Sequence, residues 1–183
     1  IVGGAATYTA ALHLMRTGAA GVLVGFGGGA AQTTRTTLGI QAPMATAIAD
    51  VAAARRDYLD ESGGRYVYVI ADGGMGRSGD VVKAIACGSD AVMIGAALAR
   101  ATDAPGGGYH WGSEAHHPDL PRGERVHVGA LAPLSEILLG PGRAADGTTN
   151  FVGALRRSMA TTGYSEVKEF QRVEVVVSPY PGG

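Results

Sequence analysis

Four short apolar runs divide the first half of the chain, and each of them ends in glycine or aspartate. They are IVGG, GVLVGFGGG, YVYVIADGG and DAVMIG, at residues 1–4, 21–29, 66–74 and 90–95. Between these runs apolar residues recur at helical spacing, which predicts helices over 7–17, 45–59 and 79–86. Strands of continuous Val and Ile character that alternate with helices indicate a parallel sheet covered on both faces.

The chain also contains an internal repeat. RTGAAGVLVG at 16–25 aligns with ACGSDAVMIG at 86–95, and each copy reads as a helix end, a glycine C-cap, a strand and a strand-end glycine. Repeated βα units of this kind form either a (β/α)8 barrel or a doubly wound sheet. A barrel needs eight such units and this chain has four, so a barrel here would be the second half of one.

The start of the sequence and the part after residue 104 indicate how the chain is organised. The opening IVGGAA lacks methionine and already lies in a strand-like run, so we interpret the sequence as a piece of a longer chain. We predict one partial domain, with a half-barrel over 1–104, a flap or loop over 105–149, and C-terminal helices and a strand over 150–183. Within the last part, SEVKEF at 165–170 opens with a serine cap and RVEVVV at 172–177 predicts the terminal strand.

The composition limits the classes of partner. The 183 residues are 46% hydrophobic and carry a net charge of −1, so no basic surface favours nucleic acid or an anionic membrane. No apolar run approaches the roughly 18 residues that span a bilayer. The single cysteine, Cys87, excludes an internal disulfide and a CxxC metal site and is typical of the cytoplasm. Its position in a helix-to-strand turn indicates a small buried residue and not a nucleophile.

The candidate chemistry lies at the ends of the predicted strands, where parallel α/β folds bind their ligands. Glycines in GFGGG and ADGGMG allow a backbone to approach a phosphate closely, and Asp72 at a strand end could accept from two ribose hydroxyls. The alternative is that DGG is only a tight turn and that Asp72 caps the following segment. GFGGG lacks both a complete GxGxxG and a GK[ST] sequence. A loop cluster of histidines has no helical HxxxH spacing, which disfavours a metal site; its members are His110, His116, His117 and His127.

Taken in order, these motifs resemble the catalytic barrel of the IMP dehydrogenase/GMP reductase family, and most of all its IMP dehydrogenase-related branch. The matching motifs are the IxGG opening strand, the GxGxG loop followed by TTR, APxATAI, VIADGG with SGD, KAIAxGxDAVMIG, APGG, PLSE and VGALRRSM. They cover nearly the whole chain except the flap. The resemblance implies a (β/α)8 barrel, of which this chain corresponds to strands five to eight.

The resemblance also implies roles for individual residues. It assigns Asp72 to the ribose hydroxyls of IMP and backbone amides and a hydroxyl to its 5′-phosphate, so the implied substrate-binding residues are Asp72, Gly73, Gly74, Gly95, Ala96 and Tyr109. Many members have a serine where Ala96 stands, so its hydroxyl contact is lost here. The carbonyls of Gly27, Gly29 and Gln32 match a potassium site. The implied cofactor is NAD, and the implied assembly is a homo-oligomer, a tetramer in the family.

One position departs from the pattern in a way that bears on catalysis. Gln32 occupies the place of the family's cysteine, whose thiolate attacks C2 of the purine before hydride leaves for NAD and water releases xanthosine monophosphate. An amide has negligible nucleophilicity, and Thr34 is an unactivated hydroxyl. The family's water-activating Arg-Tyr pair has only Arg122 as a candidate. Three interpretations therefore stay open: an NAD-dependent IMP dehydrogenase-like oxidoreductase, a GMP reductase-like activity, and a catalytically degenerate paralogue that binds nucleotide and regulates.

Overall fold

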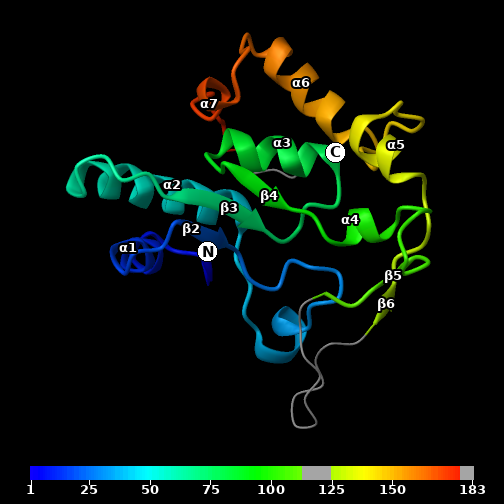
Figure 1. Ribbon diagram of the computed structural model, residues 1–183, viewed down its shortest axis with the longest axis horizontal. Coiled ribbons are helices and arrows are strands. Elements are labelled where there is room, and N and C mark those ends of the chain that lie inside the picture. The colour runs from blue at the N-terminus through cyan, green and yellow to red at the C-terminus, as the bar shows by residue number, and fades with distance from the viewer. Residues whose placement is uncertain (113–124, 178–183) are drawn as a thin grey trace.

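The computed structural model describes residues 1–112 and 125–177, and its centre is a four-stranded parallel sheet (Figure 1). The strands lie side by side in chain order, which for the described residues is the order of a barrel segment; a doubly wound sheet would reverse direction at a switch point. The α/β fold with its parallel sheet is that of a partial barrel. The strands are β1 (Val2–Ala5), β2 (Gly21–Val24), β3 (Tyr68–Asp72) and β4 (Ala91–Met93).

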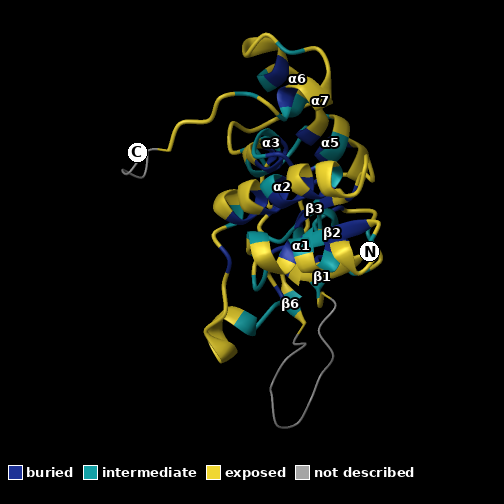
Figure 2. Ribbon diagram, turned by 90° about the vertical axis from the view of Figure 1, so that its left-hand side faces the viewer, coloured by how far each residue is buried: buried dark blue, intermediate teal, exposed yellow. Residues whose placement is uncertain are grey.

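Three helices follow the first three strands and pack on one face of the sheet. They are α1 (Tyr8–Arg16), α2 (Met44–Glu61) and α3 (Ser78–Ala86), close to the ranges that the apolar spacing predicts. The Thr7 side chain caps α1 by accepting from the backbone N–H of Ala10. The outer sides of α1 and α2 are exposed, whereas their inner sides meet the sheet (Figure 2).

The expectation that both faces of the sheet are covered is wrong for the described residues. Alternate strand residues such as Val22 and Val69 are fully buried against the helices, but on the opposite face Tyr68 and Met93 are 56% and 47% exposed. Successive side chains of a strand point to opposite faces, so this alternation marks one closed and one open face. A continuous apolar strand is required by a barrel interior as well as by a second layer of helices, and the pattern alone does not distinguish the two.

The remaining elements extend from the carboxyl edge of the sheet and then return along its outside. The helix α6 packs against α3, and α7 lies beside it. A π-helical turn, η1, follows the glycine-rich loop, and a two-stranded antiparallel hairpin and α5 lie within the predicted flap. These elements are η1 (Thr34–Leu38), α4 (Ala96–Ala99), β5 (Tyr109–His110), β6 (Val126–His127), α5 (Leu134–Leu139), α6 (Phe151–Thr161) and α7 (Val167–Phe170).

Two predictions for the C-terminal part are wrong. Residues 172–177 form no strand, because no described strand lies beside them to pair with, and Val176 is 85% exposed. The helix α7 begins at Val167 with Glu166 at its N-cap and no side-chain cap, so Ser165 does not cap it. His116, His117 and Arg122 lie outside the described residues. No described helix is long and apolar enough to cross a membrane.

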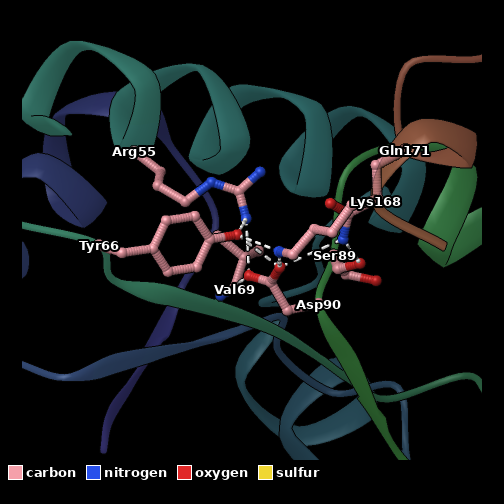
Figure 3. Close-up of polar contacts among 7 residues, drawn as sticks. All are labelled: Arg55, Tyr66, Val69, Ser89, Asp90, Lys168 and Gln171. Carbon is pink, nitrogen blue, oxygen red and sulfur yellow. Dashed lines mark hydrogen bonds and ion pairs between the residues drawn. The ribbon is translucent and has the colours of Figure 1, made fainter. Parts of the chain in front are cut away.

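A buried carboxylate ties α7 to the amino-terminal edge of the sheet (Figure 3). Asp90 accepts from Arg55 Nη1 at 2.6 Å, from the Tyr66 hydroxyl at 2.6 Å, and from the backbone N–H of Val69 at 2.9 Å, and Lys168 of α7 completes the set as an ion pair. Gln171 adds a hydrogen bond from its amide to the carbonyl of Ser89. The network therefore joins α2, β3, the start of β4 and α7.

Candidate functional site

A cavity of about 550 Å³ lies at the carboxyl edge of the sheet, where three strands end. In register, Val24 pairs with Ala71 and Asp72 with Met93, which brings the loops after β2, β3 and β4 to the same edge. The cavity is lined by Leu23, Gly28, Gly29, Ala30, Gln32, Asp72, Gly73, Gly74, Met75, Gly76, Met93, Ile94, Gly95, Ala96, His110 and Gly112. Of the residues singled out from the sequence, it gathers Gly29, Gln32, Asp72, Gly73, Gly74, Gly95 and Ala96.

The glycine-rich loop lies directly against the DGG turn, and glycine is required for that contact. A Cβ on Gly28 would stand 3.0 Å from the backbone of Gly73, and one on Gly25, which has a φ of +129°, would stand 2.3 Å from the Asp72 carbonyl oxygen. The two loops are joined by a 3.0 Å hydrogen bond from the Gly74 N–H to the Gly28 carbonyl. The glycines therefore build the rim of the cavity from backbone atoms.

Asp72 is the carboxylate of this cavity, and it does not cap the next helix. The first turn of α3 is capped by Asp80, whose carboxylate accepts from the backbone N–H of Arg77 at 3.1 Å. The Asp72 carboxylate has no hydrogen-bond partner within the described residues, and burial raises its pKa above the ordinary value. A half-buried carboxylate without a partner costs stability, and this is a property of binding sites.

Neutralising Asp72 should stabilise the ligand-free protein. A carboxyl with a raised folded pKa destabilises the fold once it is ionised, so the penalty is absent well below the unfolded pKa near 3.9 and complete above the folded pKa. We expect Asp72→Asn to raise the melting temperature at pH 7 and to leave it nearly unchanged near pH 3. Asp146→Asn is the control, because the backbone and hydroxyl of Thr148 lower the pKa of Asp146 and its loss should not stabilise. A destabilised Asp72→Asn protein at pH 7 would contradict the assignment.

Gln32 lines this cavity and also a second cavity of about 650 Å³, which is bordered by the glycine-rich loop. Its backbone N–H donates to the Gly29 carbonyl at 3.1 Å, and its side chain packs against Gly29. Gly27 lines the second cavity only. Thr34 begins η1 and lines neither cavity. The position that faces the ligand space in this loop is therefore an amide without a titratable proton.

Two residues that are neighbours in the sequence, Tyr109 and His110, differ in their position relative to the cavity. His110 lines the cavity beside Gly95 and Ala96, whereas Tyr109 does not. The ring of Tyr109 instead packs between His127, at 4.8 Å between centroids, and the guanidinium of Arg125, at 4.2 Å. The role of Tyr109 stays a prediction. His110 was noted in the sequence only as one of a loop cluster, because the orientation of a two-residue strand cannot be read from its own pattern.

Cys87, the other residue with nucleophilic potential, lies away from both cavities. It ends α3 and packs against the core, where burial raises the pKa of its thiol. A thiol of raised pKa is a poorer source of thiolate. Among the described residues no group of three or more His, Cys, Asp or Glu side chains lies close enough to hold a metal ion.

Comparisons with known proteins show which family the chain is similar to. The family model described as IMP dehydrogenase / GMP reductase domain matches residues 1–116. An uncharacterized oxidoreductase of Mycobacterium leprae is 55% identical over 181 residues, which are 97% of this chain and 48% of the relative. An inosine-5′-monophosphate dehydrogenase of Methanocaldococcus jannaschii is 33% identical over 217 residues, covering 100% of this chain and 40% of that protein.

A solved structure is similar as well. The crystal structure of an IMP dehydrogenase/GMP reductase-like protein from Corynebacterium glutamicum superposes with a TM-score of 0.88 at 55% sequence identity, over 96% of this chain and 47% of that one. The chain thus spans about half the length of the relatives it matches. On the family model, the relatives and the fold together, the chain belongs to the IMP dehydrogenase/GMP reductase family of oxidoreductases.

Proposed function

We propose that this chain is the nucleotide-binding half of an IMP dehydrogenase-like barrel, and that the complete protein binds IMP at the cavity between the loops after β2, β3 and β4. One observation carries the proposal: an unpartnered carboxylate, Asp72, faces a cavity whose rim is otherwise made of glycine backbone. This combination suits a ligand with hydroxyls to donate and an anionic group to receive backbone N–H donors.

Different residues of the cavity contact the ribose, the phosphate and the purine of the proposed ligand. Asp72 accepts from the ribose hydroxyls, the backbone N–H groups of Gly95 and Ala96 donate to the 5′-phosphate, and the purine extends toward Gln32. The N–H of Gly74, which the resemblance assigns to the phosphate, instead donates to the Gly28 carbonyl at 3.0 Å, so Gly74 supports the site by holding the turn in place. Ala96 lines the cavity but adds no hydroxyl. The open face of the sheet supports a chain that is completed by four further strands, which would cover Tyr68 and Met93.

The proposed reaction of the complete protein is the oxidation of IMP to xanthosine monophosphate, in which NAD accepts the hydride. The described residues offer no dinucleotide-binding turn, so no residue of this chain is assigned to NAD. Potassium at the carbonyls of Gly27, Gly29 and Gln32 is proposed on the resemblance alone; the Gly29 carbonyl accepts the Gln32 N–H and keeps a second lone pair. A homo-tetramer and a cytoplasmic location are proposed on the resemblance alone.

A second candidate is favoured by a single residue. Gln32 borders the cavity at the place where the family's reaction needs a thiolate, and the only cysteine of the chain, Cys87, lies elsewhere. A protein that binds the nucleotide without turnover, and acts through that binding, satisfies the same geometry. Both candidates predict that IMP binds, so a binding measurement tests them together. Only the oxidoreductase predicts a covalent adduct with IMP, so a search for the adduct distinguishes the two.

A bulky side chain at Gly95 should weaken the binding of IMP to the complete protein. A Cβ there would already stand 3.1 Å from the His110 ring, so Gly95→Leu displaces both the ring and the phosphate. We expect a loss of about 1–3 kcal/mol or more, measured by calorimetric titration. Gly79→Leu is the matched control, since a Cβ at Gly79 meets nothing within 4 Å and Gly79 lines no part of the cavity. Equal affinity of the two variants and the parent protein would refute the phosphate assignment.

A further inference from the structure

The imidazole of His110 lies next to the backbone of Gly95 in the lining of the cavity. Its Cε1 and Nε2 atoms are 3.1 and 3.3 Å from the position that a Cβ of Gly95 would occupy, and Nε2 is 3.9 Å from the corresponding position at Gly112. The ring is half-buried and makes no hydrogen bond within the described residues. Nε2 is therefore available to a ligand that contacts the backbone of Gly95.

The register of the hairpin gives this orientation a structural cause. Tyr109 pairs with His127 and His110 with Val126, so the two neighbouring side chains leave β5 on opposite faces. Tyr109 is fixed on its face by the ring of His127 and the guanidinium of Arg125. His110 is thereby directed to the cavity side, and Gly95 has no side chain that would displace it.

The charges that line the cavity indicate what His110 contacts. Asp72 and His110 are the two ionisable side chains of the described lining, whereas Arg35 and Lys83 line neighbouring cavities. A phosphate monoester carries about −1.5 to −2 charges at neutral pH, and backbone N–H groups alone leave that charge only partly compensated. Asp72 adds a negative charge to the same space. His110 is the one side chain of the described lining with a ring nitrogen that can donate to a phosphate.

We propose that the His110 imidazole donates a charge-assisted hydrogen bond to the 5′-phosphate of the bound nucleotide and selects nucleotides over nucleosides. This inference rests on the proposed function, since it assigns a further residue to the same cavity. His110 supplies the side-chain contact that Ala96 cannot make. Gly95 contributes because it has no side chain that would displace the ring or the phosphate.

The test compares two ligands that differ only in the phosphate, IMP and inosine, by calorimetric titration of the complete protein. We expect His110→Ala to weaken IMP by roughly 10- to 100-fold and to change inosine by less than about twofold. His110→Arg should recover most of the IMP affinity, because it restores a cation and a donor. His13→Ala, which removes an exposed histidine from the outer helix α1, should change neither ligand.

Each other outcome is informative. Equal losses for IMP and inosine would assign His110 to the shape of the cavity and overturn the phosphate contact, as would unchanged IMP affinity. If the parent protein binds IMP no better than inosine, the proposed phosphate site itself fails and the inference fails with it. A melting curve of each variant separates loss of binding from loss of folding, and His110→Gln supplies a neutral donor if alanine unfolds the hairpin.

Discussion

Asp90→Ala should destabilise the protein by about 3–5 kcal/mol, the cost of leaving one partner of a buried ion pair alone. The Asp90 and Arg55 side chains are 6% and 10% exposed and lie 2.6 Å apart. Without the carboxylate, the buried Arg55 guanidinium loses this counter-ion and keeps its 2.8 Å hydrogen bond to the Tyr66 hydroxyl. The hydroxyl of Tyr66 and the backbone N–H of Val69 also lose their acceptor. Urea denaturation of the complete protein measures the change.

The matched control is an ion pair of similar geometry on the surface. Arg16 Nη2 lies 2.7 Å from a Glu61 carboxylate oxygen, but the side chains are 54% and 46% exposed. Water solvates both charges after either is removed, so Glu61→Ala should change the denaturation midpoint little. Comparable midpoints for the two variants would show that the Asp90 network contributes no more than a surface pair, against this prediction.

The effect of Asp90→Ala should also depend on pH. Burial alone would raise the pKa of Asp90, but hydrogen bonds from Lys168, Tyr66 and Val69 and the charge of Arg55 outweigh it and hold the pKa below its usual value. A lowered folded pKa contributes stability that is complete above the unfolded pKa, near 3.9, and is lost as pH falls through the folded pKa. The difference between parent and variant should therefore shrink below about pH 4.

The sequence predicts the local part of this fold well, for a physical reason. Each helix on the sheet has its own apolar period, and the loops that follow β2, β3 and β4 contain glycine. The glycines at Gly25 and Gly28 and the carboxylate at Asp72 belong to these strand ends, and the structure brings all three to one edge. The spacing of apolar residues and the residue types of a turn depend on a few neighbouring residues, so both can be recognised from the sequence alone.

What the sequence could not predict depends on contacts between distant segments. The run at 172–177 has the composition of a strand, but a strand also needs a partner, and no strand of the described sheet pairs with this run. The direction of His110 is set by the pairing of β5 with β6, two strands of two residues each. The Asp90 network joins four segments through contacts between residues as far as 102 positions apart in the sequence, so no local pattern predicts it.

Gln32→Cys should introduce covalent chemistry that the parent protein lacks. The family's route needs a thiolate at this position to attack C2 of the purine, and a primary amide cannot replace it. With IMP and NAD present, intact-mass analysis of the complete parent protein should detect no adduct. The cysteine variant should give an adduct or some formation of xanthosine monophosphate. Recovery should be partial, because the new thiol must also be activated and water must be directed to the intermediate.

The control is the same substitution nearby. Gln41 lines the second cavity but not the one that holds Asp72, so Gln41→Cys should stay unmodified. A Gln32→Cys protein that binds IMP without forming an adduct would favour the second candidate, a nucleotide-binding paralogue without turnover. Turnover by the parent protein at a rate comparable to that of the cysteine variant would contradict the role given to position 32. Thr34→Ala would then test the hydroxyl of Thr34 as the nucleophile, because loss of turnover in that variant would assign the reaction to it.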